Sequence, residues 1–208
     1  MDRLPALSLV AATLAFAACD SGKGDRPVAG RTDTTKVAQK KVSTDEFCDV
    51  SFAGTSGPLF KAPAVTGGTI AATSTKWRWV NVWATWCKPC VEELPRLARW
   101  RDKLGTAYDL ELISVDDNDA DVAAFRAETP SMPASPRLAD LSKQGEWIAS
   151  LGLDAAAPVP IHIFVEPSGH VRCARAGGVR EHDLAAVQAV FAQKLCERTI
   201  FDRPKAVA

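Results

Sequence analysis

The sequence predicts an α/β domain with a central mixed β-sheet and helices on both faces. Runs of β-branched and aromatic residues, typical of buried strands, lie at residues 77–83, 109–115 and 161–165. Helical patterns follow the first two runs, and a hairpin and a closing helix follow the third. Strands that alternate with helices form parallel pairs and a hairpin adds an antiparallel one, so we expect a mixed sheet.

Local sequence signals indicate the first elements of the domain. Ordered sequence is expected to begin near Phe47, and residues 58–63 indicate a leading loop with a short edge strand. Residues 89–101 predict a helix with one apolar side, which Pro95 is expected to kink. The apolar side consists of Leu94, Leu97, Ala98 and Trp100.

The second half of the domain continues the alternation of strands and helices. Residues 116–119 can cap a helix at 120–128, which ends at Pro130. The remaining elements are an extended or looped segment at 131–139, a helix at 141–151, a turn at 167–169, its hairpin partner at 170–175 and a closing helix at 180–198.

The first residues indicate an export signal. The apolar run 7–18 is too short for a membrane span and ends in small residues just before Cys19. Residues 16–19, F-A-A-C, resemble a bacterial lipoprotein signal, in which the cysteine becomes the lipidated N-terminus; Phe16 stands where that signal usually has leucine. The alternative is ordinary cleavage after Ala17 or Ala18, which leaves Cys19 as a thiol.

We therefore expect four parts along the chain: a signal peptide at 1–18, a flexible tether at 19–46 with a lipid anchor at Cys19, the folded domain at 47–200 and a tail at 201–208. The tether is rich in polar residues and glycine and has almost no large apolar side chains, so it cannot offset its ordering entropy by burial.

Charge and cysteine content limit the classes of partner and site that we expect. Lys and Arg number 25, as do Asp and Glu, and without a long basic run no nucleic-acid partner is expected. Of the six cysteines one close pair exists, Cys87 and Cys90, and without a second such pair no metal site is expected. In an oxidising compartment two of Cys48, Cys173 and Cys196 are expected to form a structural disulfide, and three pairings are open.

The Cys87–Cys90 pair has the chemistry of a redox site. A thiolate attacks disulfides, and the unpaired N–H groups and positive dipole end of a helix stabilise it. Cys87 directly follows a predicted strand and precedes a helix, Pro89 is tolerated in a first helical turn, and Lys88 adds a positive charge. We expect Cys87 to attack a substrate disulfide and Cys90 to resolve the mixed disulfide.

Residues 80–90, V-N-V-W-A-T-W-C-K-P-C, resemble the active-site strand and turn of the thioredoxin superfamily. V-E-E-L-P at 91–95 and K-A-P at 61–63 resemble its extracytoplasmic TlpA/ResA branch, and V-P at 159–160 with E-P-S-G at 166–169 is similar to the family's cis-proline loop and hairpin. The similarity covers about 58–195. It implies a thioredoxin-like fold with a strand/helix insertion after the active-site helix.

The same resemblance assigns roles to individual residues. It implies a cis Val159–Pro160 bond beside the disulfide, with the Val159 backbone pairing with substrate. Glu93 would be a third catalytic residue that moves protons; the alternative is a solvated helix glutamate. Asn81 stands where cytoplasmic thioredoxins have a buried aspartate, and an amide cannot take a proton. The expected substrate-binding residues are Trp86, Lys88, Pro89, Val159 and Pro160.

Two relatives of this fold are disfavoured by spacing. A copper-binding relative needs C-x-x-x-C, which is one residue longer than the motif here, so we interpret His162 as structural. A peroxidase needs P-x-x-x-T-x-x-C, but Thr85 lies two residues before Cys87 and no proline stands in the required place.

The predicted function is a membrane-tethered, periplasmic thiol–disulfide oxidoreductase that acts as a reductant, needs no cofactor beyond its own disulfide and is monomeric. Its partners would be protein thiols and disulfides, with a membrane electron donor. The alternative is a non-catalytic partner-binding module in which Cys87–Cys90 is a structural disulfide; the reduction potential separates the two.

Overall fold

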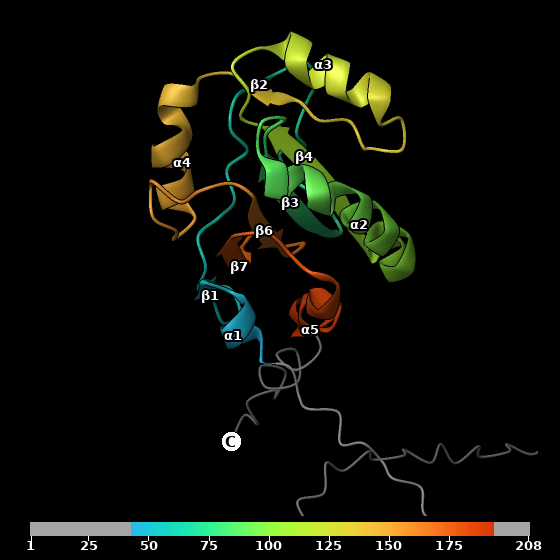
Figure 1. The fold of residues 1–208 in the computed structure, drawn as a ribbon. Helices are drawn as coiled ribbons and strands as arrows, with labels where there is room; N and C mark the ends of the chain where they lie inside the picture. The colour runs from blue at the N-terminus through green and yellow to red at the C-terminus, as the bar shows by residue number, and fades with distance from the viewer. Residues whose placement is uncertain (1–42, 194–208) are drawn as a thin grey trace, which may run out of the picture. The chain divides into compact units, whose positions relative to one another are not determined.

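A computed structural model describes residues 43–193, and within them seven strands form one sheet in the order β1-β7-β6-β3-β4-β5-β2 (Figure 1). β3 pairs in parallel with β4 and antiparallel with β6, so the sheet is mixed, as predicted. The strands are β1 (Val50–Ser51), β2 (Val65–Thr66), β3 (Trp77–Trp83), β4 (Tyr108–Ser114), β5 (Arg137–Leu138), β6 (Ile161–Val165) and β7 (Val171–Ala176).

The helices cover both sides of this sheet. In Figure 1, α2 and α5 lie to one side and α4 lies to the other, while α3 lies beyond the end of the sheet from which α2 starts. The helices are α1 (Thr44–Phe47), α2 (Lys88–Leu104), α3 (Asp119–Glu128), α4 (Gln144–Ser150) and α5 (Leu184–Ala192), with 3₁₀ turns η1 (Gly105–Ala107), η2 (Leu141–Lys143) and η3 (Glu181–Asp183). Among these helices, none is long and apolar enough to cross a bilayer.

The central strands are buried along their whole length. Every residue of β3 and of β6 is buried, which explains the continuous apolar runs that predicted them. On the face toward α2 and α5, the Trp79 ring stacks on Trp100 of α2 and on Phe164 of β6. The antiparallel register places His162 directly opposite Asn81 in the middle of this face.

Most predicted boundaries agree with the structure, and the differences have physical causes. β3 and β6 match their predicted ranges, and β4 and α3 each begin one residue earlier. The helix predicted at 141–151 is divided into η2 and α4, and Asp140 caps the start of η2. The closing helix predicted at 180–198 begins with η3 and continues as α5.

The chain is ordered before the expected domain start at residue 47, because α1 begins at Thr44. The Ser43 side chain caps α1, the buried Phe47 ring contacts Phe164, and Cys48 forms a disulfide with Cys173 of β7. This is one of the three pairings left open by the sequence. The expected signal peptide, most of the tether, Cys19, Cys196 and the tail lie outside the described residues.

The Cys48–Cys173 disulfide joins residues 125 positions apart. Because it restricts so long a stretch of the unfolded chain, the Cys48→Ala/Cys173→Ala variant is expected to lose about 2–4 kcal/mol of unfolding free energy. Urea denaturation without reductant measures this. The Cys87→Ser/Cys90→Ser variant, whose bond spans a separation of 3, is the control and should lose less. Equal urea midpoints for wild type and the Cys48→Ala/Cys173→Ala variant would contradict the expectation.

Candidate active site

The cysteine pair lies where β3 passes into α2. Four residues, 84–87, connect the end of β3 to the first residue of α2. Cys87 is the N-cap of α2, and its Sγ accepts a hydrogen bond from the Cys90 backbone N–H at 3.3 Å. Pro89 stands in the first turn, where a backbone N–H is not needed. The sulfur of Cys87 therefore lies at the positive end of the helix, bonded to Cys90 in a disulfide.

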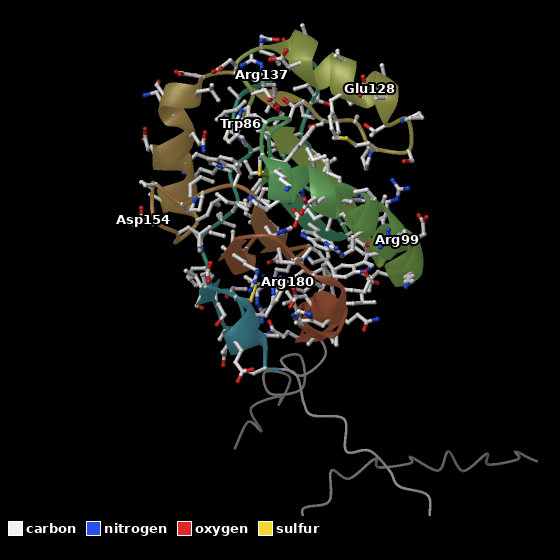
Figure 2. All side chains as sticks on the ribbon, in the orientation of Figure 1. Trp86, Arg99, Glu128, Arg137, Asp154 and Arg180 are labelled. Atoms are coloured by element: carbon white, nitrogen blue, oxygen red, sulfur yellow. A yellow bond between two sulfur atoms is a disulfide. The ribbon has the colours of Figure 1, made fainter. Side chains whose placement is uncertain are left out.

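The two sulfurs differ in their exposure to solvent. Cys87 keeps 5% of its surface exposed, whereas Cys90 has none. A disulfide or thiol that approaches from solvent can therefore reach Cys87 but not Cys90. Trp86 beside it is 66% exposed, and Figure 2 labels its side chain near the start of α2. Lys88 and Pro89, the two residues that follow Cys87, are exposed as well, whereas Val159 is half-buried and Pro160 is buried.

The proline loop faces the same sulfur. The Val159–Pro160 peptide bond is cis, as the resemblance implied. The Val159 carbonyl oxygen lies 3.6 Å from Cys87 Sγ, and Pro160 leads directly into β6. The structure therefore brings together residues that lie 72 positions apart in the chain. A carbonyl beside the reactive sulfur can accept a hydrogen bond from the backbone of an extended substrate.

Glu93 is buried and hydrogen-bonded, not solvated, with 1% of its surface exposed. Its Oε1 accepts a hydrogen bond from Asn81 Nδ2 at 3.0 Å, and its Oε2 accepts one from the Val179 N–H at 2.8 Å. His162 Nε2 lies 3.3 Å from Oε1. The amide at position 81 thus binds Glu93, and His162, which we interpreted as structural, is part of the same cluster.

Glu93 lines a pocket of about 260 Å³, together with residues of α2 and of the segment before η3. The other lining residues are Pro89, Glu92, Arg96, Gly178, Val179 and Arg180.

Asp116 holds the turn that carries Cys87, a role that the sequence did not predict. Within residues 116–119, the segment predicted to cap the next helix, Asn118 is the cap of α3, and Asp116 has a different role. Asp116 is 1% exposed and accepts hydrogen bonds from the Thr85 N–H at 3.1 Å, from Thr85 Oγ1 at 2.6 Å and from Ser114 Oγ at 2.5 Å. Its place two residues after the end of β4 is a signal in the sequence, because the carboxyl ends of parallel neighbours meet at the same sheet edge.

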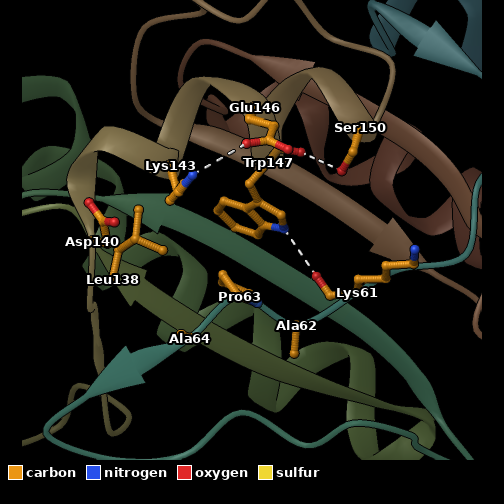
Figure 3. Close-up of a pocket in the computed structure, with 10 residues that line it drawn as sticks. All are labelled: Lys61, Ala62, Pro63, Ala64, Leu138, Asp140, Lys143, Glu146, Trp147 and Ser150. Atoms are coloured by element: carbon orange, nitrogen blue, oxygen red, sulfur yellow. Dashed lines mark hydrogen bonds and ion pairs between the residues drawn. The ribbon is translucent and has the colours of Figure 1, made fainter.

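A larger pocket, of about 390 Å³, lies between α4 and residues 61–64 (Figure 3). The Trp147 indole donates a hydrogen bond to the Lys61 carbonyl oxygen there at 3.1 Å, and Pro63 and Leu138 add apolar surface. None of its lining residues is a predicted catalytic or substrate-binding residue. Within residues 43–193, no group of three or more His, Cys, Asp or Glu side chains is arranged to hold a metal ion.

Comparisons with known proteins agree with this geometry. The sequence profile of the AhpC/TSA family matches residues 53–174. The thiol–disulfide oxidoreductases ResA of Bacillus thuringiensis and Bacillus cereus are each 28% identical over 120 residues, which are 57% of this chain and 66% of theirs. The chain thus spans just under two thirds of the length of these relatives.

Solved structures show the same fold. The thioredoxin domain of a thiol–disulfide oxidoreductase from Bacteroides vulgatus superposes with a TM-score of 0.53 at 19% identity, covering 68% of this chain and 99% of that one. A DsbF homologue from Corynebacterium diphtheriae also gives a TM-score of 0.53 at 19% identity, covering 67% and 91%. At these identities the likeness shows the thioredoxin fold.

Asp116 provides a test of how the turn is held. Asp116→Ala leaves the Thr85 N–H and the Ser114 hydroxyl without their acceptor inside the protein, so we expect a loss of about 2–3 kcal/mol in unfolding free energy. The control is Asp117→Ala, which removes an exposed neighbouring carboxylate and should change stability by less than about 0.5 kcal/mol. Urea denaturation of the oxidised proteins compares them. Equal midpoints for the two variants would contradict the role of Asp116.

Proposed function

The chain belongs to the AhpC/TSA family, in its TlpA/ResA-like branch, and on this premise we propose that it is a thiol–disulfide oxidoreductase that works outside the cytoplasm. The observation that carries the proposal is the Cys87–Cys90 disulfide at the start of α2, with 5% of Cys87 exposed and Cys90 fully buried. Its substrates in this proposal are protein disulfides.

The catalytic cycle begins with both cysteines reduced. The Cys87 thiolate attacks one sulfur of the substrate disulfide, a mixed disulfide forms, and the other substrate sulfur leaves as a thiolate that takes up a proton. Cys90 then loses its proton and attacks Cys87 Sγ, so the Cys87–Cys90 bond forms and the second substrate sulfur leaves. Two electrons pass from the protein to the substrate, and an external dithiol must restore the reduced pair.

The surrounding residues bind the substrate and accept a proton. The carbonyl of Val159 accepts a hydrogen bond from the substrate backbone, and the exposed Trp86 provides an apolar contact beside the sulfur. Glu93, one helical turn beyond Cys90, takes the proton that Cys90 must lose.

We further propose that the protein works as a reductant, is anchored to the membrane through Cys19 and acts in the periplasm as a monomer. The apolar run at 7–18, the cysteine that follows it and the polar segment after them support the anchor. A tethered domain also fits an electron donor in the same membrane.

The family name suggests peroxide reduction as a second candidate. The peroxidase motif places a threonine hydroxyl three residues before the cysteine, whereas Thr85 lies two residues before Cys87. Its hydroxyl donates a hydrogen bond to Asp116 at 2.6 Å, which stabilises the turn between β3 and α2. Disulfide exchange is the function that this site supports better.

The exchange mechanism makes opposite predictions for the two cysteines. Cys87→Ser removes the attacking sulfur, so reduction of insulin by dithiothreitol should proceed at the rate without protein. Cys90→Ser removes the resolving sulfur, so a mixed disulfide between Cys87 and the substrate should accumulate, which mass spectrometry detects. The Cys48→Ala/Cys173→Ala variant is the control and should keep its activity. Equal rates for wild type and Cys87→Ser would refute the proposal.

A further inference from the structure

We propose that His162 is a positioning residue of the exchange site, which holds Glu93 in the orientation needed to take the proton that Cys90 releases. This inference rests on the proposed function and adds to it a histidine for which the sequence predicts only a structural role. It is carried by a cluster of buried polar side chains on the α2 face of the sheet, built from β3, β6 and α2.

The contacts of His162 determine where its hydrogen lies. The indole N–H of Trp79 is a donor only, and it points at His162 Nδ1 at 3.2 Å. Asn81 Nδ2, also a donor, lies 3.4 Å from the same nitrogen. Nδ1 must therefore accept, so the ring is neutral and its hydrogen is on Nε2. Nε2 lies 3.3 Å from Glu93 Oε1 without forming a hydrogen bond to any protein atom, and the ring has no exposed surface.

Glu93 therefore has polar neighbours on three sides. Asn81 on β3 and Val179 before η3 donate hydrogen bonds to its two carboxylate oxygens, and His162 Nε2 on β6 lies 3.3 Å from Oε1. Gly178 lets this last segment approach closely, since a Cβ at that position would lie 3.2 Å from Glu93 Oε2. A buried carboxylate needs such donors in place of water. The cross-strand pairing of Asn81 with His162 sets two of the donors side by side.

The held carboxylate lies on the helix face of the resolving cysteine. Cys90 and Glu93 are three residues apart on α2 and both are buried, and side chains at this spacing have Cβ atoms roughly 5–6 Å apart. As Cys90 attacks Cys87 Sγ, its proton passes to Glu93, which returns the proton to solvent through the pocket of about 260 Å³ that it borders. His162 keeps its Nε2 hydrogen throughout and positions the base without transferring a proton.

Other charged groups face the same pocket and can influence how the rate of the resolution step depends on pH. Arg96 of α2 donates to the Val179 carbonyl oxygen at 2.6 Å and approaches Glu181 at 3.4 Å. Glu92 and Arg180 line the pocket as well, and Arg180 is labelled in Figure 2. These groups remain in all the variants below, so differences between the variants report on the buried cluster.

The test isolates the resolution step. Reduced protein is mixed with dithiobis(nitrobenzoate): Cys87 attacks the reagent disulfide, one thionitrobenzoate leaves, and the other stays bound to Cys87 in a mixed disulfide. Release of this second thionitrobenzoate reports the attack by Cys90 on Cys87 across a range of pH. Loss of a positioned base lowers a rate by about 10-fold or more, so we expect Glu93→Gln and His162→Leu both to slow release by at least that factor and to change its pH profile alike. His162→Gln, whose amide N–H can still reach Glu93, should recover most of the rate. His170→Leu, at a histidine on the β6–β7 turn, is the control and should resolve like wild type.

The double variant of Glu93 and His162 distinguishes a positioning role of His162 from a general loss of structure. If His162 acts through Glu93, then His162→Leu added to Glu93→Gln should slow release no further. Additive losses in the double variant, or wild-type resolution in His162→Leu, would overturn the role of His162. Loading of Cys87 should stay fast in every variant. A wild-type Cys87 that fails to react with the reagent would overturn the proposed function and this inference together.

A second measurement keeps the proposal falsifiable if His162→Leu does not fold. Nitrogen NMR of the imidazoles in wild-type protein distinguishes the two neutral tautomers and the charged ring. We expect the neutral form with hydrogen on Nε2 for the buried His162. A hydrogen on Nδ1, or a charged ring at neutral pH, would contradict the proposal.

Discussion

The arrangement of the site depends on how the buried strand β3 is joined to helix α2. The connection is short, so it leaves Cys87 at the N-cap, where its sulfur meets the backbone N–H of Cys90 and the positive end of the helix dipole. The rest follows from the period of the helix. Cys90 comes one turn later on the covered side, and Glu93 comes one turn after that, over the middle of the sheet.

Disulfide exchange requires both sulfur exchange with a substrate and proton transfer, and burial separates the groups that we propose for these two processes. In the proposed mechanism, sulfur chemistry with a partner takes place at the surface, at Cys87, beside the exposed Trp86 and the Val159 carbonyl. Proton transfer in this mechanism takes place inside, where Glu93 accepts hydrogen bonds from N–H donors and lines a small pocket. Cys90 lies between the two and belongs to both, because it must lose a proton before it can attack. A substrate that covers Cys87 therefore need not block the path of the proton.

The sequence predicted the elements that depend on local residues, and it missed those that depend on contacts between residues far apart in the chain. β3 and β6 were found because every one of their residues is buried, and the cysteine pair because its flanking residues carry a specific motif. β1 and β2 were missed because two-residue strands have no periodicity, and α1 because its order comes from packing and a disulfide far away in sequence. His162 could not be assigned to Glu93 because that contact depends on strand register. Asp116 could have been found from the parallel pairing of β3 with β4.

The reduction potential of the Cys87–Cys90 disulfide shows whether this bond is redox-active or structural. The purified protein is equilibrated with glutathione or dithiothreitol buffers of known potential, and the fraction of reduced Cys87 is measured by trapping with an alkylating reagent. We expect a midpoint between about −270 and −120 mV, the span of redox-active thioredoxin-fold pairs. A midpoint below about −300 mV, where structural disulfides lie, would contradict this expectation.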